Sequence, residues 1–485
     1  MRVVATIIRS ILLLVVLTII GWAFFDMGWR FFQHRQQLAL RPVELTVMHW
    51  GEPAEDKIVD DLVQRFEKEN PTVRIVRINA GGGFRTKLKT MMAAEVAPDV
   101  FYLPPEFVPE MAQQQLIAPL DQYFSKEPAE WRDDFYPLLL DGCRFDTTTN
   151  ELGKGKLYGL PKDFSTSVFY INKDLFDKAG IDWQAIQKNG WNWDQFEVEM
   201  KKIRALNGTP PFAGREIYGA MLQIWPDSLR NMLWTYDGEF FEKKPDGTTD
   251  FNDLGFDQPG SIKAMDLITR MRLKDRTAFN ATGVAKDGGA EFKAGNIGCV
   301  GPVGRWYVPQ LKDPKSIKWD VLPVPAGSTR ASQMFYNGWA MSAKSKHPDE
   351  AYRLIRFLCG REGQVQQGRA GLAIPALKSV ANSPDFLEPE GIPKHDSQQF
   401  IDAIQHARIG QLPRQTEFTR MVEQTTNEAI QTGRRTPTEA ADVLQAKWTS
   451  ELNSPLRQKQ WPAMPWATIL SIAAAVLATV TALLW

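Results

Sequence analysis

Two apolar stretches without a single charge lie near opposite ends of this chain, at residues 10–25 and 461–485. A helix of about 20 apolar residues crosses the hydrocarbon layer of a membrane. The second stretch meets that length and carries Trp461, Trp466 and Trp485, aromatic residues of the kind that lie at membrane interfaces. We therefore expect a transmembrane helix at 463–485, since a buried core helix is seldom apolar all round.

The first stretch follows Arg2 and Arg9, as in an export signal, and ends with Trp22, Phe24 and Phe25 without a small-x-small cleavage site. This favours an uncleaved signal anchor within residues 1–30 over a cleaved signal peptide. The flanking positive charges nearly balance, but long domains are translocated largely regardless of such charges. We expect the middle of the chain outside the cell membrane, in the periplasm or on the extracellular side, with both tails inside.

The composition of the chain narrows the choice of ligand. Its 57 basic and 57 acidic side chains cancel, so no global field attracts nucleic acid. Three distant cysteines exclude a disulfide scaffold, although one pair could still form a bridge. The 16 tryptophans and 27 phenylalanines exceed what a core requires. Tryptophan offers a flat face with one polar donor, which suits the apolar C–H faces of sugar rings.

The middle of the chain has the pattern of an α/β protein. Residues 43–48 alternate as a strand, residues 58–66 have helical spacing, and residues 73–78 form a second strand. Strand, helix and strand in this order predict a βαβ unit with a parallel sheet. Further helices are predicted at 85–95, 174–179 and 193–206, and others begin at Ser261 and Pro348. Thr436-Pro437-Thr438-Glu439 is a capping box that begins the last of them.

The sequence contains no motif of a known catalytic or metal site. Neither H-E-x-x-H, G-x-S-x-G nor a P-loop occurs, and the five histidines are not at metal-ligand spacing. The Gly81-Gly82-Gly83 triplet lacks the rest of a phosphate-binding motif, so we expect it to let the backbone approach a neighbour or a ligand. A glycosidase pair needs only spatial proximity of two carboxylates, and no pair stands out. We predict no catalytic residue, no metal and no cofactor.

Several runs along the chain together resemble those of the extracellular solute-binding proteins, the receptors of sugar-importing ABC transporters that include the maltodextrin-binding protein. In order, they are Val47-Met48-His49-Trp50-Gly51, Phe66 to Pro71, Lys87 to Ala94, Ala97-Pro98-Asp99-Val100, Tyr158-Gly159-Leu160-Pro161, Phe169 to Phe176, Phe292 to Gly295, Val300-Gly301-Pro302, Leu322 to Pro325 and Asn337 to Ser342. The most specific of them spans Tyr158 to Phe176. The resemblance covers residues 43–452.

This resemblance implies a two-lobed periplasmic-binding-protein clamp of the type II kind, which closes on a ligand between its lobes. Roughly 410 residues are also too many for one core and suit two lobes. We place lobe 1 at 43–162 plus 328–378 and lobe 2 at 163–327 plus 379–452. Loops at the carboxyl ends of parallel strands converge on such a crevice.

Nine residues become candidates for ligand binding through their positions relative to the family's strands. An aromatic residue and acids near the strand ends can stack on sugar rings and accept hydroxyl protons, and Arg85 can donate through its guanidinium. Leu103-Pro104-Pro105-Glu106 departs from the aromatic residue that the maltodextrin binder has there, which weakens a maltodextrin assignment. The candidates are Trp50, Glu52, Arg85, Glu106, Asp163, Ser165, Trp225, Trp306 and Trp339.

The function expected from this resemblance is capture of a carbohydrate outside the membrane and its delivery to the permease subunits of an ABC transporter. A membrane-anchored sugar sensor for a signalling partner and an envelope enzyme acting on glycans are the alternatives. The sequence leaves open which sugar is bound and whether the ligand is a phosphorylated polyol. It also leaves open whether the C-terminal apolar segment is an anchor or part of a fused permease.

Overall fold

The computed structural model describes residues 43–280, 288–311, 317–389, 394–413 and 415–454, with six further positions between 18 and 29. It contains two compact units, of which residues 45–70 and 75–451 form the larger. The predicted spans at 1–30 and 463–485 lie outside the described residues, except for those six positions. Among the residues described, no helix has both the length and the apolar character needed to cross a bilayer. In the smaller unit, Arg74 pairs with Glu44 at 3.0 Å.

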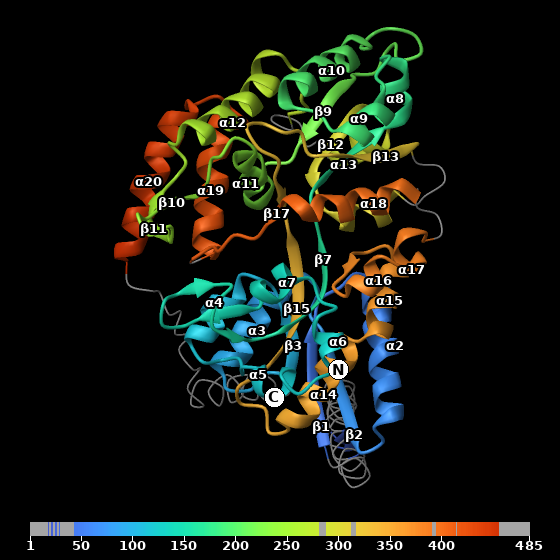
Figure 1. The fold of residues 1–485 in the computed structure, drawn as a ribbon, viewed down its shortest axis with the longest axis vertical. Coiled ribbons are helices and arrows are strands. Elements are labelled where there is room, and N and C mark those ends of the chain that lie inside the picture. Colours follow the sequence, from blue (N-terminus) through green and yellow to red (C-terminus); the bar gives the residue numbers. More distant parts are fainter. Residues whose placement is uncertain are drawn as a thin grey trace, which may run out of the picture. The chain divides into compact units, whose positions relative to one another are not determined.

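The first sheet has six strands in the order β16-β7-β15-β3-β1-β2 (Figure 1). Strand β1 is parallel to β3, whereas β15 is antiparallel to both β3 and β7. The sheet is therefore mixed, and the predicted parallel arrangement holds for the β1–β3 pair. Its strands are β1 (Val43–His49), β2 (Val73–Asn79), β3 (Val100–Leu103), β7 (Leu160–Ser165), β15 (Phe335–Met341) and β16 (Ile374–Pro375).

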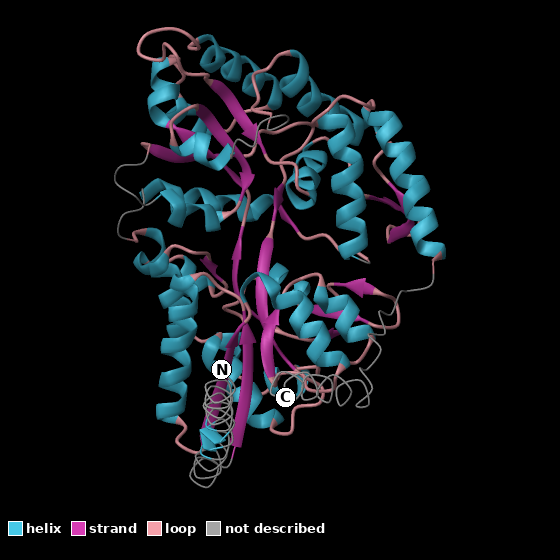
Figure 2. Ribbon diagram, turned by 180° about the vertical axis from the view of Figure 1, so that it is seen from behind, coloured by secondary structure: helices cyan, strands magenta, loops and turns pink. Residues whose placement is uncertain are grey.

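The predicted first helix is α2 (Pro53–Glu69), and its boundaries follow from local chemistry. Proline occupies its first turn, where a missing N–H costs nothing, and the helix ends at Asn70, directly before Pro71. Its apolar residues at helical spacing are all buried, as expected: Ile58, Val59, Leu62, Val63 and Phe66. This helix packs against α14 (Pro348–Leu358) and α15 (Arg361–Ala370), which also contact β7 (Figure 2).

The remaining helices near the first sheet are short. They follow the strands of the first sheet or precede the return of the chain to it. They are the 3₁₀ helix η1 (Gly81–Gly83), α3 (Phe84–Ala93), α4 (Phe107–Gln113), α5 (Asp121–Phe124), α6 (Ala129–Arg132), α7 (Pro137–Gly142), α16 (Lys378–Ala381) and α17 (Pro384–Leu387). A Cβ atom added to any glycine of η1 would meet nothing within 4 Å. No neighbouring part of the described chain approaches this triplet closely, and the approach of a ligand to it remains a prediction.

The second sheet has four strands in the order β13-β8-β12-β9. Strand β12 is parallel to β9 and antiparallel to β8, so this sheet is also mixed. Its strands are β8 (Val168–Asn172), β9 (Tyr218–Leu222), β12 (Ile297–Val303) and β13 (Trp319–Pro323). Helices on this sheet are α8 (Lys173–Lys178), α9 (Trp183–Asn189), α10 (Trp193–Ala205), α11 (Pro226–Thr235), α13 (Gly288–Lys293) and α18 (Lys394–Asp402).

Two of the segments that carry the chain between the sheets lie next to one another in the larger unit. The chain leaves β7 at Ser165 and enters β8 at Val168, and it returns through β14 (Ser332–Gln333) to β15. These crossings are joined directly, because the Ser167 amide donates to Ser332 Oγ at 2.8 Å. Strand β14 also pairs with β17 (Ala407–Arg408). The crossings are therefore hydrogen-bonded to one another rather than independent linkers.

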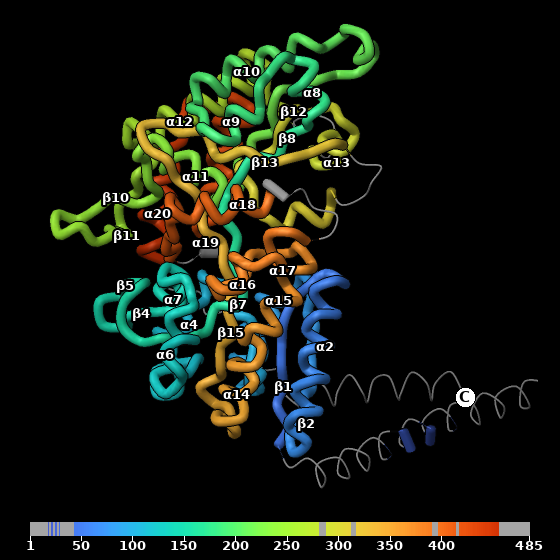
Figure 3. Tube along the Cα trace, turned by 45° about the vertical axis from the view of Figure 1, so that its right-hand side comes forward, coloured from blue at the N-terminus to red at the C-terminus, as the bar shows by residue number. Residues whose placement is uncertain are grey.

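Small sheets and helices complete the larger unit. A three-stranded sheet contains β4 (Arg144–Asp146), β5 (Glu151–Leu152) and β6 (Lys156–Leu157), and a two-stranded one contains β10 (Phe241–Lys243) and β11 (Thr249–Leu254) (Figure 3). The other helices are α12 (Pro259–Thr269), η2 (Arg270–Lys274), η3 (Arg305–Leu311), η4 (Ala403–His406), α19 (Gln415–Ile430) and α20 (Pro437–Asn453). Gln258, rather than Ser261, occupies the N-cap of α12, and Ser261 donates instead to the Gly255 carbonyl at 2.6 Å.

Candidate ligand-binding site

A cavity of about 240 Å³ is lined by residues that follow strands of the first sheet and by residues near the crossing segments. Aromatic, proline and charged side chains share the lining. The residues around the cavity are Trp50, Arg85, Pro104, Pro105, Glu106, Pro109, Leu152, Trp225, Asp227, Gln333, Met334, Phe335, Tyr336, Ile409, Gly410, Gln411 and Leu412.

Trp50 supplies the aromatic wall at the end of β1. Its ring makes edge contacts with Phe84 and Tyr102, with 4.8 Å between centroids in each case. The Arg85 guanidinium lies 5.9 Å from the centre of the Trp50 ring. Arg85 Nε also donates to Glu106 Oε1 at 2.7 Å. Helix α3 and the start of α4 thus place one ion pair beside the indole.

A second aromatic group lies where α11 begins and where the chain returns to β15. Trp225 precedes α11, and its ring centroid lies 5.3 Å from that of Phe335. Trp306 makes an edge contact with Phe335 at 4.8 Å and is 39% exposed. Trp225 and Phe335 line the cavity, and Trp306 lies beside them. The cavity therefore has indole or phenyl rings on two of its walls.

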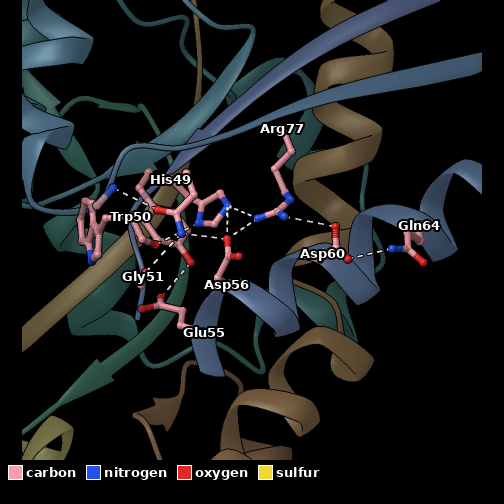
Figure 4. A network of polar contacts seen from close by, with 11 residues as sticks. His49, Trp50, Gly51, Glu55, Asp56, Asp60, Gln64 and Arg77 are labelled. Atoms are coloured by element: carbon pink, nitrogen blue, oxygen red, sulfur yellow. Dashed lines mark hydrogen bonds and ion pairs between the residues drawn. The ribbon is translucent and has the colours of Figure 1, made fainter. Parts of the chain in front are cut away.

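A network of hydrogen bonds and ion pairs fixes the turn that carries Trp50 (Figure 4). His49 is fully buried, and burial lowers its pKa, so the neutral imidazole is favoured. The geometry fits one tautomer: Nδ1 donates to the Trp50 carbonyl at 2.9 Å, and Nε2 accepts from Arg77 at 3.1 Å. Arg77 also pairs with Asp56 and with Asp60. Trp50 is thus held from behind by β2 and α2.

Tyr102, against which Trp50 packs, is held by a buried cluster of charged residues. Its hydroxyl donates to Glu55 Oε1 at 2.9 Å, and Lys162 Nζ donates to the same oxygen at 3.0 Å. Lys162 also pairs with Asp163 and lies 4.7 Å from the centre of the Tyr102 ring. Nearby carboxylates outweigh burial here and raise the pKa of Lys162, which keeps the ammonium charged.

An open groove of about 790 Å³ continues from the cavity. The chain around Thr149 to Leu152 forms one side, and strands β10 and β11 with their turn form the other. The groove and the cavity share Leu152 and Gln411. Gln411 accepts a hydrogen bond from the Leu152 amide at 3.2 Å. The small cavity is therefore the inner end of a longer, largely polar channel.

The cavity brings together four of the nine predicted residues, Trp50, Arg85, Glu106 and Trp225, while Trp306 lies at its side. The other four do not line it. Asp163 and Ser165 are buried in β7 and Trp339 in β15, and Glu52 is exposed at the N-cap of α2. Ser165 Oγ accepts the Arg305 amide at 2.7 Å, and the Trp339 ring packs 4.4 Å from Tyr102.

Asp227 and Phe335 are lining residues that were not predicted from the sequence. Asp227 lies two positions after Trp225, in the first turn of α11, and Phe335 begins β15. A carboxylate close to the candidate Trp225 was a usable signal for the former. No local pattern marks Phe335, because its exposure to the cavity depends on the pairing of β15 with β7.

The described residues contain no group of three or more His, Cys, Asp and Glu side chains arranged to hold a metal ion. Cys143, Cys299 and Cys359 are buried free thiols, so the bridge left open by the sequence is absent. Burial raises the pKa of Cys143 to about 12, which leaves its thiol protonated and unreactive at neutral pH.

The larger unit has two mixed sheets with helices packed on them, and hydrogen-bonded crossing segments join the sheets beside a cavity with aromatic walls. This arrangement is that of a binding protein of the periplasmic clamp class. Residues 50–365 match the family described as bacterial extracellular solute-binding protein, and the chain belongs to that family.

Among curated relatives, a binding protein of Brucella abortus (strain 2308) is 28% identical over 331 residues, 66% of this chain and 73% of that protein. The galactooligosaccharide-binding protein of Bacillus subtilis (strain 168) is 23% identical, over 70% of this chain and 75% of its own length. The sn-glycerol-3-phosphate-binding periplasmic protein UgpB of Escherichia coli (strain K12) is also 23% identical, over 80% of this chain and 87% of its own length.

Solved structures share the fold. The ABC substrate-binding protein Lmo0181 from Listeria monocytogenes, in complex with cycloalternan, has a TM-score of 0.70 and 21% identity, covering 85% of this chain and all of that one. UgpB from Mycobacterium tuberculosis, in complex with glycerophosphocholine, has a TM-score of 0.68 and 19% identity. The match covers 84% of this chain and 98% of that one. These relatives bind both sugars and phosphate esters, so membership of the family leaves the ligand undecided.

Proposed function

We propose that this chain is the substrate-binding receptor of an ABC transporter, and that it binds a carbohydrate in the cavity and delivers it to the permease subunits. The observation that carries this proposal is the combination of the Trp50 and Trp225 walls with polar acceptors between them. Aromatic faces stack on the C–H faces of a sugar, and carboxylates accept its hydroxyl protons. Nothing in this scheme breaks a bond, so the ligand leaves intact.

Closure of the lobes is the step that would signal occupancy to a permease. Ligand contacts with both halves favour the closed state, and a ligand shifts this equilibrium only by its difference in affinity for the two states. The paired crossings at Ser167 and Ser332 are suitable hinge elements. We keep the proposed lobes at 43–162 plus 328–378 and 163–327 plus 379–452.

We also propose that the apolar segments at 10–25 and 461–485 anchor the chain outside the cytoplasm, in the cell membrane. Anchoring raises the effective concentration of the receptor near its permease. Carbonate extraction of membranes tests this proposal. The full-length chain should remain in the membrane pellet, and its appearance in the soluble fraction would contradict the proposal.

Calorimetric titration of the full-length chain, purified in a detergent without a sugar headgroup, tests the receptor function. We expect at least one mono- or oligosaccharide to bind and to be recovered chemically unchanged. Trp225→Ala should weaken that binding at least tenfold, because an aromatic anchor in a binding site is worth roughly 2 kcal/mol or more. Val198→Ala, at a 53% exposed residue of α10 that does not line the cavity, is the control and should bind as the parent does.

Turnover of the sugar would contradict the receptor function. Unchanged affinity of the Trp225→Ala variant would contradict the placement of the site.

A further inference from the structure

The charged side chains that line the cavity are already balanced by partners within the protein. Three charged residues line it: Arg85, Glu106 and Asp227. Arg85 is the one cation among these lining residues, and it is held by Glu106 through Nε at 2.7 Å and a second guanidinium nitrogen at 2.5 Å. A negatively charged ligand would therefore find no cation in the lining that lacks a carboxylate partner.

Asp227 differs from Glu106 because its carboxylate is not engaged. Within the described part of the chain it makes no hydrogen bond, although it lies in a partly buried position on the cavity wall. Burial raises the pKa of Asp227, and the positive charges of Arg230 and Arg85 oppose that rise. In the ionised form, which the two guanidinium charges favour, its two oxygens offer about four acceptor sites and no donor. The Asp227 side of the cavity therefore favours a ligand that carries hydrogen-bond donors.

Arg230 balances the charge of Asp227 from behind the wall. It follows Asp227 by one turn of α11, is 1% exposed and lies 4.5 Å from the centre of the Phe240 ring. A Cβ atom added to Gly410 would lie 1.7 Å from an Arg230 guanidinium nitrogen, so Arg230 lies directly behind the wall that Gly410 provides. Arg230 is not itself a lining residue. Within the described residues its Nε and Nη2 have no hydrogen-bond partner, and from behind the lining its positive charge acts on Asp227.

The start of α11 also shows how an anion is disfavoured. The first turn of a helix attracts negative charge through its free N–H groups. Here that turn already contains a carboxylate, Asp227. The Gly81–Gly83 loop, the one glycine-rich run suited by composition to a phosphate, is not among the lining residues. Neither feature is therefore available to a phosphate group in the cavity.

We propose that Asp227 determines the ligand class of this receptor: it accepts hydroxyl protons from an uncharged, polyhydroxylated ligand and excludes phosphate esters. This inference rests on the proposed carbohydrate-binding function. A phosphate monoester brings a charge of roughly −1.5 to −2, and burying it beside Asp227 and Glu106, where the lining cation Arg85 is already paired with Glu106, is unfavourable. The site would thus differ from that of a relative that binds sn-glycerol 3-phosphate.

Titration of the full-length chain with matched probes tests this assignment. The probes are maltotriose, a galacto-oligosaccharide, chitotriose with free amino groups, glucose 6-phosphate and sn-glycerol 3-phosphate. We expect an uncharged oligosaccharide to bind and both phosphate esters to bind at least a hundredfold more weakly. Asp227→Asn should weaken the binding of the uncharged ligand at least tenfold. It should also reduce the preference of the protein for this ligand over the phosphate esters at least tenfold.

Asp253→Asn, at an exposed carboxylate on β11, is the control and should change neither affinity. If Asp227→Asn does not fold, Asp227→Ser carries the same expectation. Binding of sugar and phosphate ester with similar affinity, preference for chitotriose, or an unchanged preference in both Asp227 variants would each overturn the inference while leaving a carbohydrate receptor. Failure of every carbohydrate to bind would overturn the proposed function itself.

Discussion

Trp50 and Trp339 both pack on Tyr102, yet only Trp50 reaches the cavity. The centroid distances to Tyr102 are similar, 4.8 Å for Trp50 and 4.4 Å for Trp339. Trp339 lies inside β15 between two neighbouring strands and is 2% exposed, whereas Trp50 follows the last residue of β1. A side chain beyond a strand end is free to face a crevice, and one within a central strand is covered. The position along the strand separates a tryptophan that lines the cavity from a tryptophan of the core.

Substitution of Lys162 tests whether the charged cluster beneath Trp50 is part of the core. Lys162→Met leaves Glu55 and Asp163 partly buried without their shared cation. Breaking a buried ion pair in this way costs ~3–5 kcal/mol, because a charge is left uncompensated. Urea unfolding, monitored by circular dichroism, should show that loss in the free energy of unfolding.

Lys57→Met, which breaks the exposed pair with Asp61 on α2, is the matched control and should leave the midpoint unchanged. Equal midpoints for the two variants would show that the cluster contributes nothing to stability.

At the scale of elements, the predicted capping box of α20 is confirmed in both directions. The Thr436 amide donates to Glu439 Oε2 at 2.8 Å, and the Glu439 amide donates to Thr436 Oγ1 at 3.2 Å. These bonds satisfy two groups at the helix start that have no partner within the helix. The match arose because the motif depends on four consecutive residues and on no distant partner.

Removing one half of the capping box should lower the stability of the protein by a measurable but modest amount. We expect Thr436→Ala to lower the free energy of unfolding by about 1 kcal/mol, since one amide at the helix start loses its acceptor. Thr449→Ala, on the exposed face of the same helix, should stay within ~0.5 kcal/mol of the parent. Denaturant unfolding of both variants provides the comparison, and similar losses would show that the cap is not what stabilises this end.

Strand pairing was less predictable than the strands themselves. The predicted strands at 43–48, 73–78 and 100–103 match β1, β2 and β3 closely, because alternation and turn residues are local signals. The antiparallel insertion of β15 between β3 and β7 has no such signal, since β15 and β3 are separated by more than 200 residues. The lobe boundaries remain predictions for the same reason.

At the scale of the whole molecule, Arg305 and Asp396 join α18 to the start of η3. Both are fully buried, and their nearest charged atoms are 3.9 Å apart. Within the described residues, neither oxygen of Asp396 has a hydrogen-bond partner. Burial raises the pKa of Asp396 to about 7, Arg305 opposes the rise and Asp320 adds to it. The protonated acid is therefore the form that this site favours.

The raised pKa makes the stability of the whole chain depend on pH. The folded state binds a proton at Asp396 up to about pH 7, whereas the unfolded chain loses it near pH 3.8. The contribution is fully present below the unfolded pKa and is lost as pH rises to about 7. From pH 5 to 8, the free energy of unfolding of the parent should fall relative to Asp396→Asn by roughly 3 kcal/mol, about two pH units at ~1.4 kcal/mol per unit. Urea unfolding at both pH values measures this, and a pH-independent difference would contradict it.

The sequence by itself predicted several of the helices and strands, the capping box of α20 and the resemblance to solute-binding proteins. The resemblance to the family proposed Trp50, Arg85, Glu106 and Trp225, and these four line the cavity; their contact with a ligand remains a prediction. Tertiary structure alone decided that Asp163, Ser165 and Trp339 are covered while Asp227 and Phe335 face the cavity. The physical reason is that burial depends on which distant strands and helices pack over a side chain, and neighbours in sequence do not specify that packing.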